Sequence, residues 1–517
     1  MKVLRWLWSW LRRIPVRFTA VFLPLLAISL VALTALLDAV GAAALADRIA
    51  RPPPGAAGLA AFALRLGGAG LAVAALLAGA LLASYNLAAV LYRRIRPRPA
   101  VRVHPPVDAT PGDGSRLDGF RRIGIILAGG GAKGAYQAGA MKAIHEFLEE
   151  HGALDRVAMI AGTSIGAWNA MFWLAGLVKP PDDRGRSAHE AWWREISLDR
   201  IVELDTYVPA RTNHFLQPAP WEETFRDLFV EPGEVRRRLA RLFPPPGTSG
   251  GDGDPPLHFY LTRSNVELGQ LEFATNYAGL RQRTRPRLED QDPGAVEPLV
   301  EPDRYEVIEG GDLGSALART RRAVFASMDL PPLFPYREIR VHRTEWFEDG
   351  GVVENLPIRF GTGIERCDLL FVLPLNASFA QPVDHHSITR RLFRVMDVRQ
   401  GVMERTSLKM VYLYNELAAL RRQAAARRET EPGARLERTA MRREHEPVSV
   451  FSIVPEAPLA VGTADFWKSG AAGEAFDLLY AATRNELREN FEEDTDPGWI
   501  RMTRVSPVGE RSHFDDF

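Results

Sequence analysis

The stretch IGIILAGGGAKG, residues 123–134, is the most informative part of the chain. Its first half is a short apolar run rich in β-branched residues, which predicts a buried strand. Apolar residues then recur near helical spacing up to residue 148, and Gly152 can end that helix. The glycines therefore join a strand to the start of a helix. Backbone N–H groups and the helix dipole favour an anion there, and glycines let the backbone approach it closely.

Two common anion sites do not fit this loop. Gly129, Gly131 and Gly134 have the spacing of the dinucleotide fingerprint, which also needs an acid after the next strand to hold the ribose. The next predicted strand, residues 157–161, is followed by GTS, so the required acid is missing at this position. The phosphate-loop pattern fails because Lys133 is followed by glycine rather than Ser or Thr. An oxyanion cradle or a plain tight turn remains, and no nucleotide is expected.

A second strand-to-helix junction carries the candidate nucleophile. The sequence GTSIG, residues 162–166, lies between the predicted strand 157–161 and a predicted helix, 167–177. A nucleophile elbow needs glycines beside the serine because the turn is strained and crowded. The pattern also arises by chance in a chain with 43 glycines, so the strand–turn–helix context is what favours Ser164. A forming alkoxide is stabilised at the start of a helix.

The third candidate is a carboxylate on a glycine-bounded turn. Asp349, followed by Gly350 and Gly351, ends the apolar–polar stretch 341–347, where it can reach a serine on a neighbouring strand. The alternative is an ordinary type I turn. Histidine is the rival base, since an α/β-hydrolase has the order Ser, Asp or Glu, His. The residues alone leave both bases open; the histidines after Asp349 are His385, His386, His445 and His513.

Four blocks of the chain resemble those of the patatin-like phospholipases, in family order. They are residues 129–139, 162–167, 326–335 and 349–357, and the likeness covers about 123–376, roughly half the chain. The resemblance implies an α/β fold: a three-layer hydrolase sheet with helices on both faces. It also implies that Ser164 is the nucleophile and Asp349 its partner, with no catalytic histidine.

The same resemblance assigns the remaining site residues. The amides of Gly129, Gly130 and Gly131 form the oxyanion hole, and Gly162 and Gly166 form the elbow. Supporting positions are Lys133, Gly134, Gly350 and Gly351. The long segments between Ser164 and Asp349 depart from the family pattern, which leaves the lid and the substrate pocket undefined.

The expected reaction is hydrolysis of a (phospho)lipid carboxylic ester through an acyl-enzyme, without metal or cofactor. Two alternatives stay open. One is a non-catalytic lipid-binding or scaffold protein on a hydrolase fold, and the other is a Ser-His-Asp esterase. The expected partner is a membrane phospholipid or another lipid ester. A net charge of zero gives no overall field for nucleic acid.

The first hundred residues predict a two-helix transmembrane hairpin. Residues 18–37 and 66–91 are apolar, uncharged and long enough to span a bilayer. Basic residues precede the first span and follow the second, which places both ends and the catalytic domain in the cytoplasm, at the inner or plasma membrane. A signal peptide is the alternative, because A-x-A patterns follow the first run.

The expected domain order follows from these segments. It is a membrane hairpin, 1–98; a Pro/Gly-rich linker, 99–119; a catalytic domain, 120–376, with inserts at 178–256 and 281–302; and a helical and strand extension, 377–517, packing on it. Residues 395–428 look helical, as a core-packing or a membrane-surface helix. The single cysteine, Cys367, excludes an internal disulfide and precedes an apolar run, so we expect a buried thiol.

Overall fold

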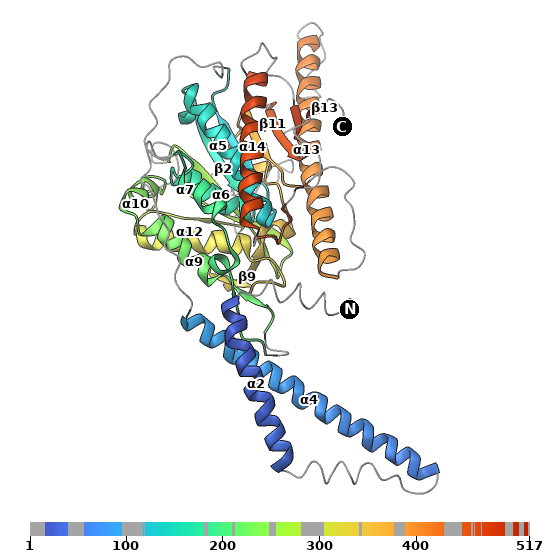
Figure 1. The fold of residues 1–517 in the computed structure, drawn as a ribbon. Helices are drawn as coiled ribbons and strands as arrows, with labels where there is room; N and C mark the ends of the chain where they lie inside the picture. The colour runs from blue at the N-terminus through green and yellow to red at the C-terminus, as the bar shows by residue number, and fades with distance from the viewer. Residues whose placement is uncertain are drawn as a thin grey trace. The chain divides into compact units, whose positions relative to one another are not determined.

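The computed structural model describes most of the chain, in two compact units (Figure 1). One unit comprises residues 1–100, 198–221 and 332–335, and the other comprises 101–197, 222–331 and 336–517. The described residues are 16–39, 56–95, 117, 119–179, 185–208, 212–247, 255–280, 304–340, 344–376, 388–428, 447–455, 459, 461–466, 468–491, 500–505 and 511–514. The predicted insert 281–302 and nearly all of the predicted linker 99–119 lie outside them.

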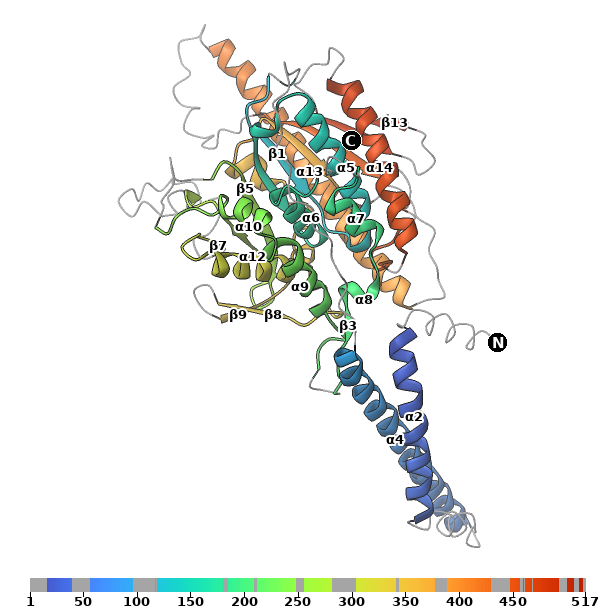
Figure 2. The same ribbon diagram turned by 60° about the vertical axis from the view of Figure 1, so that its left-hand side comes forward.

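Two apolar helices dominate the first unit, α2 (Val16–Ala39) and α4 (Ala56–Ile95) (Figure 2). Alanines on α4 pack against Val21, Phe22 and Leu25 of α2, and the Ser84 hydroxyl donates to Ser29 Oγ at 2.8 Å. Small residues and a hydroxyl pair allow such close helix packing. Among the described residues one stretch, Leu71–Leu91, is long and apolar enough to cross a membrane, and the apolar stretch of α2, Ala20–Ala35, is shorter.

Part of the predicted insert 178–256 belongs to this same unit. It contains α8 (Leu198–Ile201) and the paired strands β3 (Glu203–Leu204) and β4 (Leu216–Gln217). The Asn86 amide on α4 donates to the Tyr207 carbonyl at 3.0 Å and accepts from the Tyr207 N–H at 2.6 Å. A sequence segment that interrupts the catalytic region therefore folds with the apolar helices.

The second unit contains a central, mostly parallel sheet, which confirms the α/β prediction in its coarse form. Parallel strands are covered on both faces, which explains the continuous apolar runs of β1, β2 and β10. The strand order is β13 (Arg511–Phe514), β12 (Ile500–Val505), β11 (Ser449–Pro455), β10 (Leu369–Leu373), β1 (Ile123–Leu127), β2 (Val157–Gly162), β5 (His258–Asn265), β6 (Gln270–Thr275) and β7 (Tyr305–Val307). In addition, β9 (Thr344–Asp349) pairs with β5 and with β8 (Arg337–Arg340).

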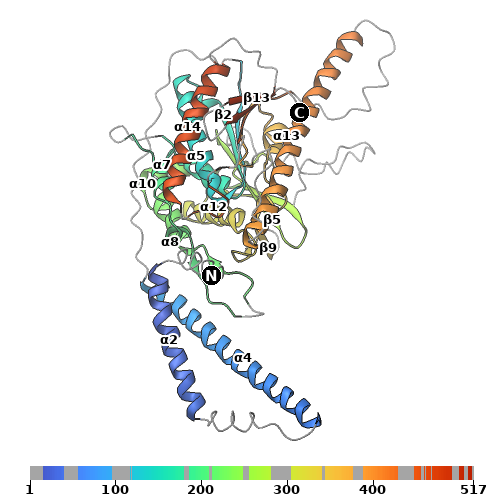
Figure 3. The ribbon, with the colours of Figure 1, turned by 45° about the vertical axis from the view of Figure 1, so that its right-hand side comes forward.

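Helices cover the two faces of this sheet (Figures 1 and 3). On one face α5 (Gly134–Glu150) packs along α14 (Ser469–Phe491), where Phe491 contacts Phe147 of α5 and both Phe371 and Phe451 of the strands. On the other face α13 (Ile388–Arg428) contributes Leu408 and Val411 to the core. Further helices are α6 (Ile165–Leu174), α7 (Ala188–Arg194), α9 (Ala219–Phe225), α10 (Gly233–Ala240) and α12 (Leu313–Met328).

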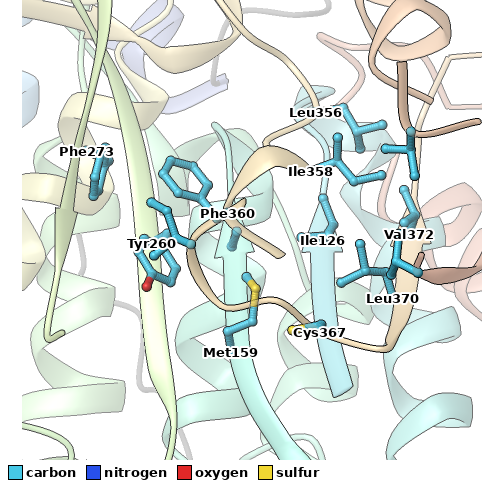
Figure 4. Packing of buried hydrophobic residues seen from close by; sticks show 14 of the residues in the cluster. Ile126, Met159, Tyr260, Phe273, Leu356, Ile358, Phe360, Cys367, Leu370 and Val372 are labelled. Carbon is cyan, nitrogen blue, oxygen red and sulfur yellow. The ribbon is translucent and has the colours of Figure 1, made fainter. Parts of the chain in front are cut away.

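The core beneath α13 is built from alternate strand residues (Figure 4). Ile126, Met159 and Leu370 come from β1, β2 and β10 and pack with residues of the 356–364 segment. Cys367 is buried in this cluster, as expected, and burial raises the pKa of its thiol above the ordinary range. It is therefore a structural thiol rather than a reactive one.

The sheet continues beyond residue 376. Strands β11, β12 and β13 come from the region predicted as an extension, and β11 pairs in parallel with β10. In the same region α13 begins before residue 395 and covers the sheet face described above. The region thus supplies both strands and a covering helix to the unit that contains Ser164 and Asp349.

Candidate active site

Ser164 lies on a strained turn between β2 and α6. Its φ of 54° and ψ of −124° are sparsely populated for a residue with a side chain, and such strain costs about 1–3 kcal/mol. A Cβ at Gly162 would come within 2.5 Å of the Gly166 backbone, and one at Gly166 within 2.5 Å of the Leu127 carbonyl. Glycine is required at both positions by this close approach. The Ser164 N–H donates to Ser327 Oγ of α12 at 2.8 Å.

Asp349 reaches this turn from the end of β9. Strand β6 pairs with one edge of β5, and the other edge pairs first with β2, through residues 258–261, and then with β9, through residues 263–265. This shared edge brings residue 349 near the end of β2. The Asp349 N–H donates to the Asp329 carbonyl at 3.1 Å, and the Ser264 hydroxyl donates to the Asp349 carbonyl at 2.9 Å. The Asp349 carboxylate accepts hydrogen bonds from the Ser164 hydroxyl and, at 2.7 Å, from the Gly351 N–H.

Burial gives Asp349 an unusual proton affinity. The side chain is almost inaccessible, and its burial raises the pKa of the carboxyl from 3.8 to about 7, although the hydrogen bonds from Ser164 and Gly351 lower it. The nearby Asp329 adds a smaller upward effect on this pKa, and its own carboxylate is paired with Arg337 at 2.6 Å. A carboxylate with a pKa near 7 can accept a proton at neutral pH far better than an ordinary aspartate.

The glycine loop lies directly against the nucleophile. A Cβ on Gly129 would come within 2.9 Å of Ser164 Cβ. The Gly129 N–H already donates to the Asn355 carbonyl at 3.3 Å, whereas the N–H groups of Gly130 and Gly131 have no acceptor within the described part of the chain. Gly131 has a φ of +58° and would place a Cβ 2.1 Å from the Thr463 carbonyl. Two unpaired amides thus remain in the loop, and Gly129 is the weakest of the three expected donors.

The other supporting positions have packing roles. The buried Lys133 donates to Asn376 Oδ1 at 2.8 Å and to Asp397 Oδ1 at 2.7 Å, so its charge is held inside the protein. A Cβ on Gly134 would come within 2.5 Å of Ile165, and one on Gly350 within 2.4 Å of Thr262 Oγ1. These glycines let neighbouring elements approach each other beneath the site.

Sequence reasoning missed several side chains that hold the loop, either directly or through another side chain. Asn355 stands inside the block 349–357, so its position in that block was an available signal. Asn376, Asp397 and Glu404 follow later in the chain, and nothing in their local sequence distinguishes them. They come together only through the fold, because α13 crosses the sheet face beside the loop.

Of the four histidines that follow Asp349, only His513 lies within the described residues. His385, His386 and His445 lie outside the described residues. His513 belongs to β13, five strands away from β2 in the sheet order. At the usual spacing between strands this corresponds to roughly 24 Å, too far for a base acting on Ser164.

Residues 125–360 match the sequence model of a family described as patatin-like phospholipase. They form a patatin-like phospholipase domain. The match contains the glycine loop, Ser164 and Asp349, and it ends before α13. The domain supports lipid acyl hydrolase activity and implies a lipid ester as substrate.

Whole-chain comparisons add little to this match. No curated protein matches the chain. Among solved structures it is similar to the crystal structure of VipD from Legionella pneumophila, with 13% sequence identity, a TM-score of 0.28, and coverage of 77% of this chain and 73% of that chain.

Proposed function

We propose that this chain is a membrane-tethered serine hydrolase that cleaves carboxylic esters of phospholipids or other lipids through a Ser164–Asp349 dyad. The observation that carries the proposal is the hydrogen bond from the Ser164 hydroxyl to a buried carboxylate with a pKa of about 7. A nucleophile and a base in hydrogen-bond contact are the minimum requirement for covalent ester hydrolysis. The patatin-like domain supplies the substrate class.

The reaction proceeds in two steps. Ser164 Oγ attacks the ester carbonyl carbon while Asp349 accepts the hydroxyl proton, and the carbonyl oxygen becomes an oxyanion. The tetrahedral intermediate collapses to an acyl-enzyme, and the departing alcohol of the lipid takes the proton from Asp349. Water then attacks the acyl group with Asp349 as base, which releases a fatty acid and restores the Ser164 hydroxyl.

The glycine loop supplies the electrostatic part of catalysis. The Gly130 and Gly131 amides are the donors that we assign to the oxyanion, since the Gly129 amide is already engaged with Asn355. Preorganised donors act where charge develops and need no rearrangement during the reaction. Loss of one such donor typically costs about 2.7–4 kcal/mol of transition-state stabilisation.

Gly130→Ala tests this assignment. The added Cβ would come within 2.8 Å of Leu375 Cδ1 and 3.0 Å of its Cβ, so the loop must shift. We expect kcat to fall by about 10²–10³-fold with little change in KM, because the interaction exists mainly in the transition state. Steady-state kinetics on a soluble ester measures both constants.

Gly470→Ala is the matched control for this change, since a Cβ there meets no atom within 4 Å, and its kinetics should equal the wild type. Leu375→Ala combined with Gly130→Ala should recover part of the lost rate by making room for the methyl group. An effect of Gly130→Ala on KM alone would instead indicate a ground-state anion site.

The apolar helices support the membrane part of the proposal. Leu71–Leu91 has a mean hydropathy of 1.9, and Leu71, Leu77 and Leu81 on this stretch are exposed. Contiguous exposed apolar surface of this kind marks a membrane or protein contact. Basic residues flank the hairpin on both outer sides, which favours a cytoplasmic catalytic domain at the inner or plasma membrane. A tether raises the effective concentration of the enzyme at its lipid substrate.

Removal of the first 120 residues should separate anchoring from catalysis. A chain that starts at Arg121 is expected in the soluble fraction, with hydrolysis of a dispersed short-chain ester retained and the rate on bilayer lipid strongly reduced. A reporter fused after Phe517 of the full chain should be cytoplasmic.

The control for tethering is an unrelated transmembrane helix fused ahead of Arg121, which should restore the rate on bilayers. If the shortened chain stays in membranes, or if the reporter lies on the far side, the two-span hairpin is wrong and a single span or a signal peptide must replace it.

A further inference from the structure

A buried carboxylate from outside the matched domain lies behind the glycine loop. Glu404 is on α13, beyond the matched residues 125–360, and only 2% of its surface is exposed. Its Oε1 accepts from the side-chain amides of Asn355 at 2.5 Å and Asn376 at 2.7 Å. Its Oε2 accepts from the Asn376 N–H at 3.2 Å. One carboxylate thus fixes two amide side chains.

The first of these amides holds the start of the loop. The Asn355 side chain donates to the Gly129 carbonyl at 3.1 Å, and the Asn355 carbonyl accepts from the Gly129 N–H at 3.3 Å. Gly129 is therefore bound on both sides by one residue. Because Gly129 packs against Ser164 Cβ, a shift of Asn355 would move the loop relative to the nucleophile.

The second amide holds the end of the loop. Asn376 Oδ1 accepts from Lys133 Nζ at 2.8 Å. Asp397, two turns before Glu404 on α13, accepts from the same ammonium at 2.7 Å and from the Thr463 hydroxyl at 2.8 Å. The Thr463 carbonyl in turn accepts from the Ala132 N–H at 2.9 Å. Both ends of the loop are thus connected to one face of α13.

Burial of the Glu404 carboxylate costs free energy. Burial raises the pKa of Glu404 to about 7, while the amides of Asn376 and Asn355 and the charge of Lys133 lower it. An apolar side chain would pack on the sheet at less cost, as Leu408 does one turn later on α13. A fully bonded buried polar network instead fixes one arrangement of the groups it joins.

We propose that Glu404 is a positioning residue for catalysis, which sets the oxyanion loop against Ser164 through Asn355 and Asn376. The proposal rests on the hydrolase function proposed above and deepens it. It makes α13 a functional part of the site rather than a covering helix. Glu404 touches neither substrate nor the reacting atoms, so its effect passes entirely through the position of the loop amides.

The test compares three variants of the full-length protein. Glu404→Ala should lower kcat by about 10²-fold with KM nearly unchanged, because a small misplacement of a preorganised group is enough for such a loss. Glu404→Gln keeps an acceptor oxygen and should recover most of the rate. Leu408→Ala is the structural control: it should lower the melting temperature, through the cavity it leaves, but retain kcat.

Amide hydrogen exchange gives a readout that does not need activity. Peptides covering residues 129–134 should exchange faster in Glu404→Ala than in the wild type and in Leu408→Ala, since the Ala132 and Lys133 N–H groups are bonded only while the loop is held. If Glu404→Ala does not fold, Asn376→Ala removes one of the two amides and should give a smaller effect of the same kind.

Two results would overturn the proposal. One is an equal loss of kcat in Leu408→Ala and Glu404→Ala, which would mean general destabilisation. The other is unchanged exchange of the loop in Glu404→Ala or, where that variant does not fold, in Asn376→Ala. A wild-type protein without Ser164-dependent hydrolysis would refute the proposed function instead, and loop exchange would then decide on the positioning role alone.

Discussion

Ser164→Ala is expected to abolish ester hydrolysis, with kcat falling by as much as about 10⁶-fold, the loss typical of removing a serine nucleophile. The variant lacks the only atom that can form the acyl-enzyme in the proposed mechanism, while the elbow and the glycine loop stay intact. Alanine is smaller than serine and fits the same turn. The measurement is fatty acid release from phospholipid vesicles and from a soluble ester.

A serine-reactive fluorophosphonate probe provides the parallel test. It should label the wild type at Ser164 and fail to label Ser164→Ala. Ser315→Ala changes an exposed serine on α12 and should label and react like the wild type. Absence of labelling in the wild type, together with lipid binding, would favour the non-catalytic lipid-binding alternative.

Asp349→Asn is expected to have the second largest effect, a loss of about 10⁴-fold in kcat, the size seen when a triad aspartate becomes asparagine. The amide keeps the shape and an oxygen for the Gly351 N–H, but it cannot accept the Ser164 proton. In the wild type kcat/KM should rise with pH through about 7, because Asp349 acts only when it is ionised. The residual activity of the variant should lack this rise.

The melting temperature of Asp349→Asn should distinguish a loss of catalysis from a loss of folding. The folded-state pKa of Asp349 is raised from 3.8 to about 7, so folding favours the protonated form. The stability that the protonated Asp349 carboxyl contributes is fully present below pH 3.8 and is lost as pH rises through about 7. A neutral amide carries no such penalty, so the melting temperature of Asp349→Asn at pH 8 should not fall below that of the wild type.

The double variant His385→Ala and His386→Ala is the control for a histidine base. It should hydrolyse esters at the wild-type rate if Asp349 is the base. Loss of activity with the fold intact would favour the Ser-His-Asp esterase.

Local sequence determined the parts of the site that depend on neighbours in the chain. The apolar run 123–127, the glycines after it and the GTSIG turn predict two strand-to-helix junctions, and the structure has both. These features are predictable because glycine spacing and apolar periodicity act over a few residues. Length and hydropathy likewise indicated apolar helices near the start, of which only Leu71–Leu91 is long enough to span a bilayer among the described residues.

Tertiary structure decided what depends on contacts between distant residues. The pKa of Asp349 follows from burial and from Ser164, 185 positions earlier in the sequence. The contacts of Glu404 with Asn355 and Asn376 exist because α13 lies across a sheet assembled from strands on both sides of it in the chain. The contact between the segment 198–221 and α4, through Tyr207 and Asn86, arises in the same way. The amino-acid sequence alone does not specify the register between strands or the burial of a side chain. Burial and register together set the proton affinity of the proposed base, Asp349, and the contacts that support the glycine loop.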